Sequence, residues 1–205
     1  MSRTGRGRPS GAGCRAGAVD AMEPLVTPRL RLVPATLELV QAEMTASASL
    51  AQALGAVVPD NWPPEDLADV LPLFLDRLQR EPGHTGWYGW YGLLADIAPG
   101  KLVLGASGGF KGPPEDGEVE IGYAVLPQFQ GRGYATEMVL AMTGWALAQP
   151  GVERVTAEVM AGNHASIRVL AKAGFQPAGE GEEPGSLRFV LVPEPAHLAK
   201  TCRHC

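Results

Sequence analysis

The chain has 205 residues, 45% of them apolar, which is enough for the core of one domain of ordinary size. Its formal net charge of −5 argues against a nucleic-acid-binding body, and three cysteines are too few for a disulfide scaffold. No stretch approaches the roughly 18 consecutive apolar residues of a membrane span. We therefore expect a cytoplasmic protein that binds neither nucleic acid nor membrane.

The two ends of the chain differ in composition from the middle. Residues 1–22 hold four arginines and one acid among Gly and Ser, and they lack the apolar core of a secretory signal. We interpret 1–22 as a disordered basic leader, with Met22 as a possible true start and a polyanion-binding arm as the alternative. Residues 194–205 are expected to form a flexible tail, and residues 23–193 the domain. Cys202 and Cys205 have the spacing of half a zinc site, but Cys14 is the only other cysteine, so no metal site is predicted.

Hydrophobic periodicity and breaker residues predict the secondary structure in chain order. The predicted elements are a strand at 30–33, a helix from Thr36 to about 53, a helix at 67–78 kinked or restarted at Pro72, strands at 87–94, 102–110 and 118–125, a helix from about Ala135, a strand at 154–159, a short helix after Asn163, and strands at 175–180 and 187–192. This order favours one mixed sheet with helices on it over a regular βαβ alternation.

The predicted strand at 118–125 has two unlike faces. One face is apolar, and the other carries Glu118, Glu120, Gly122 and Ala124. The small residues on the second face leave room either for a ligand or for a close helix contact.

A glycine-bearing turn follows this strand and opens an amphipathic helix. Gly131 and Gly133 allow a tight turn, and the helix that follows offers free N–H groups and the positive end of its dipole. Such a turn can seat phosphate oxygens, although its spacing fits neither the P-loop nor the dinucleotide fingerprint. From the glycines alone, a tight turn without a ligand is an equally good interpretation.

Two motifs in this part of the chain resemble those of the GCN5-related N-acetyltransferase (GNAT) superfamily. Gln130-Gly131-Arg132-Gly133-Tyr134-Ala135 resembles its acetyl-CoA motif, Gln/Arg-x-x-Gly-x-Gly/Ala. The segment from Asn163 to Phe175, with Ser166 and Leu170, resembles the C-terminal signature of the subgroup that includes ribosomal-protein alanine acetyltransferases. The opening Thr27-Pro28-Arg29-Leu30-Arg31-Leu32 is similar to the start of the same subgroup. The resemblance covers roughly residues 25–192.

The resemblance implies a single α+β domain whose sheet is mixed and mostly antiparallel, with six to seven strands and helices on both faces. The sheet would splay between its fourth strand, 118–125, and its fifth, and acetyl-CoA would lie in that opening. The residues implied in cofactor binding are Tyr123, Ala124 and Val125 beside the pantetheine, Gln130, Gly131, Arg132, Gly133, Tyr134, Ala135 and Thr136 at the pyrophosphate, and Asn163.

An acceptor amine must lose a proton before it attacks a thioester, because a free lysine titrates near pKa ~10.4 and an α-amine near ~7.7–8. The resemblance places a carboxylate base on the small-residue face of the fourth strand. Glu120 is the first candidate and Glu118 the second; both can instead be solvated charges.

The tyrosine that usually serves as general acid in this superfamily is replaced here by Leu170. Ser166 or Asn163 could hydrogen-bond the leaving sulfur instead. We therefore expect an acetyl-CoA-dependent N-acetyltransferase, a monomer or homodimer without metal, that acetylates a small-molecule or peptide amine by direct attack in a ternary complex. The alternative is a catalytically silent CoA-binding module of the same fold.

Overall fold

The computed structural model describes residues 22–193, apart from the side chains of residues 65 and 66. The predicted leader, except Met22, and the predicted tail with its two cysteines lie outside the described residues. Met22 is partly buried against the core. No helix in the described part of the chain is both long and apolar enough to cross a bilayer.

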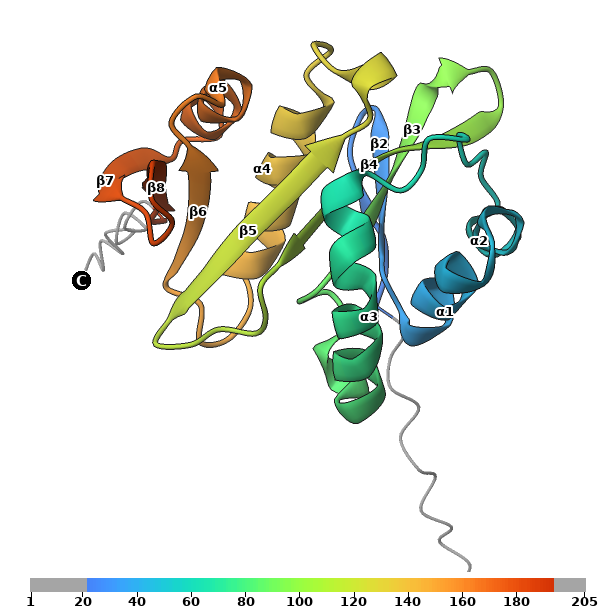
Figure 1. Ribbon diagram of the computed structural model, residues 1–205, viewed down its shortest axis with the longest axis horizontal. Helices are drawn as coiled ribbons and strands as arrows, with labels where there is room; N and C mark the ends of the chain where they lie inside the picture. Colours follow the sequence, from blue (N-terminus) through green and yellow to red (C-terminus); the bar gives the residue numbers. More distant parts are fainter. Residues whose placement is uncertain (1–21, 194–205) are drawn as a thin grey trace, which may run out of the picture.

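Eight strands form the sheet, in the order β1-β2-β3-β4-β5-β6-β8-β7 (Figure 1). Their bounds are β1 Leu25–Val26, β2 Leu30–Pro34, β3 Trp90–Ala98, β4 Lys101–Phe110, β5 Glu118–Val125, β6 Arg154–Met160, β7 Gln176–Glu180 and β8 Ser186–Leu191. Every neighbouring pair is antiparallel except β5 and β6. The predicted mixed, mostly antiparallel α+β sheet is confirmed. The strand beyond the predicted six or seven is β1, which at two residues is too short to show an alternating pattern.

The sheet opens between β5 and β6, as the family resemblance implied. These parallel strands are paired only from Glu118 opposite Arg154 to Glu120 opposite Thr156. Beyond Glu120, β5 keeps its pairing with β4 on the other side, up to Val125 opposite Ala106, while β6 runs away from it (Figure 1). The backbone of residues 121–125 therefore borders an opening whose closed end is at Glu120.

Helices cover both faces of the sheet (Figure 1). Helices α1 (Leu37–Thr45), α2 (Ser47–Leu54) and α3 (Glu65–Arg80) lie on one face, and α4 (Tyr134–Leu147) lies on the other, beside α5 (His164–Lys172). Two short 3₁₀ helices, η1 at Pro82–His84 and η2 at Pro127–Phe129, lie in connections of the described chain. On the α4 side, Trp87, Trp90, Phe110 and Trp145 pack as one aromatic cluster. The aromatic residues of the predicted strand at 87–94 thus serve largely as core.

Two of the helix predictions need correction. The helix expected from Thr36 to about 53 is two helices, because Ala46 has an extended backbone that ends α1. No Gly or Pro marks this break in the sequence. Helix α3 is continuous through Pro72, so the predicted restart does not occur. Thr36 caps α1 as expected, since its side chain accepts a hydrogen bond from the N–H of Leu39.

Gly144 offers a direct test of helix α4. It is exposed, and a Cβ built on it meets no heavy atom within 4 Å. Gly144→Ala should raise the free energy of unfolding by about 0.5–1 kcal/mol, because alanine loses less backbone entropy in a helix. Urea denaturation measures the change. Gly174→Ala should act in the opposite direction, because Gly174 has φ +91°, which is unfavourable for any residue with a Cβ. A loss of stability in Gly144→Ala would contradict this account of α4.

Candidate active site

The small-residue face of β5 opens onto free space. Gly122 is exposed, and a Cβ built on it has no heavy atom within 4 Å. The alternative of a close helix contact is therefore wrong for this residue. Glu120 and Ala124 share this face with it, because side chains alternate along a strand.

The turn after β5 presents a run of unpaired backbone donors. Gly131 and Gly133 adopt φ +74° and +87°, the left-handed region that glycine tolerates best. Gly133 is the N-cap of α4, and the first helical bond runs from the N–H of Glu137 to its carbonyl. None of the N–H groups of residues 131–136 donates to an acceptor in residues 22–193. Six consecutive donors at a helix N-terminus can receive the oxygens of a phosphate group.

The side chains of the glycine motif mostly hold this turn in place. The Gln130 amide donates to the Val125 carbonyl over 2.8 Å, which ties the turn to the end of β5. Tyr134 is buried, and its hydroxyl donates to Asp96 over 2.6 Å. Tyr134 therefore contributes only its backbone N–H to the run of free donors at residues 131–136. Ala135 and Thr136, in the first helical turn, are half-buried.

A cluster that the sequence reasoning did not assign links the N-terminal turn to this site. The Arg29 guanidinium lies 2.7 Å from the Glu137 carboxylate and donates to the Arg132 carbonyl over 2.8 Å. Thr27 Oγ1 donates to the same carboxylate over 2.6 Å. These contacts join residues more than a hundred positions apart in the sequence, and no local sequence pattern predicted them. The cluster places a positive charge beside Gly133, whose ideal Cβ would be 3.3 Å from Arg29 Nη2.

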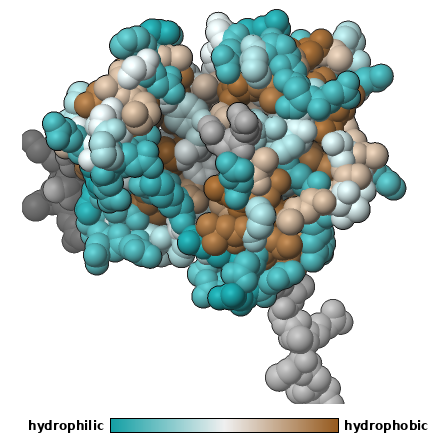
Figure 2. Space-filling view, in the orientation of Figure 1, coloured by the Kyte–Doolittle hydropathy of each residue, from teal (hydrophilic) through white to brown (hydrophobic). Residues whose placement is uncertain are grey.

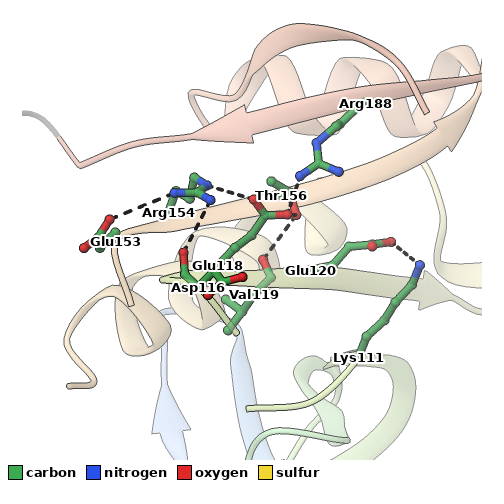
Figure 3. Close-up of polar contacts among 9 residues, drawn as sticks. All are labelled: Lys111, Asp116, Glu118, Val119, Glu120, Glu153, Arg154, Thr156 and Arg188. Carbon is green, nitrogen blue, oxygen red and sulfur yellow. Dashed lines mark hydrogen bonds and ion pairs between the residues drawn. The ribbon is translucent and has the colours of Figure 1, made fainter. Parts of the chain in front are cut away.

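Glu118 is locked into an ion-pair network (Figure 3). Arg154 Nε donates to it over 2.8 Å, Thr156 Oγ1 donates over 3.1 Å, and Arg188 also donates to it. Burial alone would raise the pKa of Glu118, but the hydrogen bonds from Arg154 and Thr156 and the charge of Arg188 outweigh it and lower the pKa. A carboxylate held ionised in this way is a weak base, and its contacts join β5 to β6 and β8.

Among the described residues, the Glu120 carboxylate has one ion-pair partner, the ammonium of Lys111, whose Nζ is 2.6 Å from Glu120 Oε1 (Figure 3). The Glu120 side chain is 23% exposed and that of Lys111 is 69% exposed. Burial alone would lower the pKa of Lys111, but the hydrogen bond and charge of Glu120, with the charges of Glu158 and Glu182, outweigh it and raise the pKa.

Helix α5 brings the other predicted residues together with β5. The Asn163 side chain caps α5 by accepting from the N–H of Ser166 over 3.0 Å, so its direct role is to order this helix start. Ser166 Oγ lies 2.7 Å from the Tyr123 hydroxyl, a pair that joins β5 to α5. Burial raises the pKa of Tyr123 despite the hydrogen bond to Ser166, so its phenol stays protonated. Leu170 is fully buried and takes no part.

A second unassigned carboxylate lies on the α1–α3 side. Glu43 accepts from Trp62 Nε1 over 2.6 Å and from the Tyr91 hydroxyl over 2.5 Å, and burial raises its pKa despite these two bonds. Tyr91 on β3 pairs with Ser107 on β4, which pairs with Ala124 on β5, so the side chains of Tyr91 and Ala124 lie on the same face of the sheet. At the usual strand spacing the two residues are about 10 Å apart. In this half, which α1–α3 build, hydrophobic residues also reach the surface, whereas the half from β5 onward is mostly hydrophilic (Figure 2).

The cluster around Glu137 predicts a pH-dependent contribution to stability. Burial alone would raise the pKa of Glu137, but the hydrogen bonds from Thr27 and Arg29 lower it. The stabilisation is therefore present above the unfolded pKa of about 4.3 and is lost as the pH falls through the lower folded pKa. Glu137→Gln should cost about 1–3 kcal/mol of unfolding free energy at pH 7, and the difference should narrow below about pH 4. Urea denaturation at several pH values measures it, with the exposed Glu115→Gln as a control that should change little. A difference that does not depend on pH would contradict the ionic origin.

Known proteins resemble this chain in sequence and in fold. The N-acetyltransferase named "Uncharacterized N-acetyltransferase YjdG" of Bacillus subtilis is 30% identical over 151 residues, covering 74% of this chain and 88% of that protein. An acetyltransferase of Salmonella typhimurium, described as modifying the N-terminal serine of ribosomal protein L7/L12, has a similar fold with a TM-score of 0.55, 16% identity, and coverage of 84% and 100%. The ribosomal L7/L12 acetyltransferase RimL, solved with coenzyme A, gives a TM-score of 0.55, 17% identity, and coverage of 83% and 98%.

The model of the acetyltransferase (GNAT) domain family matches residues 29–176. The match contains the Arg29–Glu137 cluster, all of β5, the glycine turn and α5. It confirms the family that the two motifs predicted. The chain belongs to the GNAT family of acetyl-CoA-dependent acetyltransferases.

Proposed function

We propose that the protein transfers the acetyl group of acetyl-CoA to a primary amine by direct attack in a ternary complex. One observation carries the proposal: β5 and β6 part immediately after Glu120, and the free edge of β5 leads from there to a run of free N–H groups at residues 131–136. One end of this opening suits a pyrophosphate, and the other end has a carboxylate.

The length of the opening supports this arrangement. Glu120 and Val125 are five residues apart, roughly 17 Å along an extended strand. An extended pantetheine arm is of comparable length. With the pyrophosphate at Gly131–Thr136, the arm would run along Tyr123, Ala124 and Val125, and the thioester would lie near Glu120.

Glu120 is the proposed base, acting directly or through water. It shares the open face of β5 with Gly122, and its ion-pair partner is a mostly exposed lysine that can move away. Glu118 is a poor alternative, because two arginines hold it ionised. A base is needed because alkyl amines are mostly protonated at neutral pH.

The departing thiolate can receive a hydrogen bond from the Tyr123–Ser166 pair. This pair supplies a protonated phenol at the start of α5, one helical turn before Leu170, where the family's tyrosine is missing. The proposed donor to the sulfur is Ser166, with Tyr123 as its hydrogen-bond partner.

The acceptor is proposed to be an amine on a peptide or a small molecule. The similarity to an acetyltransferase that modifies an N-terminal serine makes short peptides with a free N-terminus the first acceptors to test. Glu43 and the exposed apolar residues Met44 and Leu73 lie on the α1–α3 side, where they can contact such an acceptor. Thiol release from acetyl-CoA with a panel of peptides, amino acids, polyamines and aminoglycosides tests the enzyme against a silent binding module. Tight CoA binding without turnover on any of them would favour the module.

The phosphate seat is tested by Gly133→Ala. Alanine is strained at the φ of +87° that Gly133 adopts, and its methyl group would lie 3.3 Å from Arg29 Nη2, so the turn should shift. CoA should then bind at least about tenfold more weakly, a change of ~1.4 kcal/mol. Gly174→Ala is the matched control, because it imposes similar strain at φ +91° after a different helix. Calorimetry should show unchanged CoA affinity in Gly174→Ala. Equal affinities in both folded variants would remove the phosphate role from this turn.

The base is tested by Glu120→Gln. Turnover should fall by about tenfold or more, with CoA affinity nearly unchanged, because a positioned base typically contributes ~10²–10⁴-fold. The loss should shrink at high pH, where more of the acceptor is already neutral. Glu118→Gln should instead lower the melting temperature. If Glu118→Gln shows the kinetic pattern and Glu120→Gln does not, the assignment of the base is wrong.

A further inference from the structure

Lys111 brings a primary amine of the chain itself to the proposed base. It follows β4 directly, and its backbone N–H donates to the Glu120 carbonyl over 3.0 Å. Its Nζ lies 2.6 Å from Glu120 Oε1, and the Arg77 guanidinium donates a hydrogen bond to the Lys111 carbonyl oxygen over 2.8 Å. The backbone of Lys111 is therefore held by two elements, while its side chain is mostly exposed and able to swing.

This amine lies at the closed end of the opening between β5 and β6. The pairing of these strands ends at Glu120 opposite Thr156, and Lys111 reaches Glu120 from the β4 side of β5 (Figure 3). The thioester is proposed above to lie near Glu120. Among the described residues, Lys111 carries the amine that is paired with the Glu120 carboxylate, so this amine would lie beside the thioester.

We propose that Lys111 is itself an acceptor, so that the protein acetylates its own Lys111 Nζ from acetyl-CoA. The inference rests on the proposed function. The ammonium first gives a proton to Glu120, directly or through water. The nitrogen lone pair then attacks the thioester carbonyl, the N–C bond forms and the C–S bond breaks. CoA leaves as the thiolate and the second amine proton passes to solvent, which leaves an acetamide on Lys111.

Solution chemistry alone would favour other lysines. The chain has four lysines, of which Lys101 and Lys172 are exposed and described, whereas Lys200 is not described. Lys111 faces the carboxylates of Glu120 on β5, Glu158 on β6 and Glu182 in the β7–β8 turn, which keep it protonated. Its neutral fraction is therefore smaller than that of an unpaired lysine, and uncatalysed acetylation should be slowest there. Preferential acetylation of Lys111 would thus report positioning by the site.

The experiment incubates the full chain with acetyl-CoA at several protein concentrations and follows each lysine by peptide mass spectrometry. We expect Lys111 to be acetylated at least about tenfold faster than Lys101 and Lys172, with a rate constant independent of protein concentration. Glu120→Gln should slow the reaction by about tenfold or more. This variant also separates acetylation catalysed by the site from uncatalysed acetylation. Removing the carboxylate frees the Lys111 amine, which would speed the uncatalysed reaction but slow the catalysed one.

Equal acetylation of the three lysines, or faster acetylation of Lys111 in Glu120→Gln, would overturn the proposal. CoA affinity and thiol release with the amine panel are measured on the same preparation. If CoA binds and an amine is acetylated while Lys111 is not, self-acetylation is wrong and the proposed function stands. If CoA does not bind, both fail.

Discussion

The three-residue parallel pairing between β5 and β6 is the constraint on which the rest of the site depends. Pairing from Glu118 to Glu120 joins the two halves of the sheet, and its end frees one side of residues 121–125. On the other side these residues remain paired with β4, so the strand stays straight and ordered. A rigid strand with one free edge can hold an extended ligand without rearrangement. Everything proposed for the site follows from this edge and from what lies at its two ends.

Charge is distributed along β5 so that two similar carboxylates have different chemistry. Glu118 has Arg154, Arg188 and Thr156 as partners, and these keep it ionised while they join β5, β6 and β8. Glu120, on the same face two residues later, has one exposed lysine. The first arrangement suits structure, because a half-buried carboxylate with two cations beside it is costly to protonate. The second suits proton transfer, because its single partner can be displaced.

Distant segments support the glycine turn at the other end of the opening. The turn cannot hold its own shape, because its N–H groups have no internal acceptors in the described chain and its glycines are conformationally free. Arg29 compensates by bonding both the Arg132 carbonyl and the Glu137 carboxylate, and Gln130 anchors the turn to β5. The N-terminal turn at Thr27 and Arg29 is thus part of the candidate site, although it lies about a hundred residues away in sequence.

Local sequence was sufficient for the elements and for the family. The alternation at 118–125 predicted β5 at its observed bounds, Thr36 and Asn163 predicted helix starts, and the glycines predicted a tight turn before α4. These features depend on neighbours within a few residues, which a sequence displays directly. The break at Ala46 and the two-residue β1 were not predicted, because no Gly or Pro marks the break and two residues are too few to show an alternating pattern.

The sequence by itself determined that Glu118 and Glu120 share a face and that a glycine-bearing turn and a helix follow them. Only the tertiary structure decided how they differ, because Arg154, Arg188 and Lys111 come from three other segments of the chain. It likewise decided that Arg29 supports the turn and that Tyr123 meets Ser166. Periodicity reports which way a side chain points, whereas the charge of a site depends on which distant side chains the fold brings beside it.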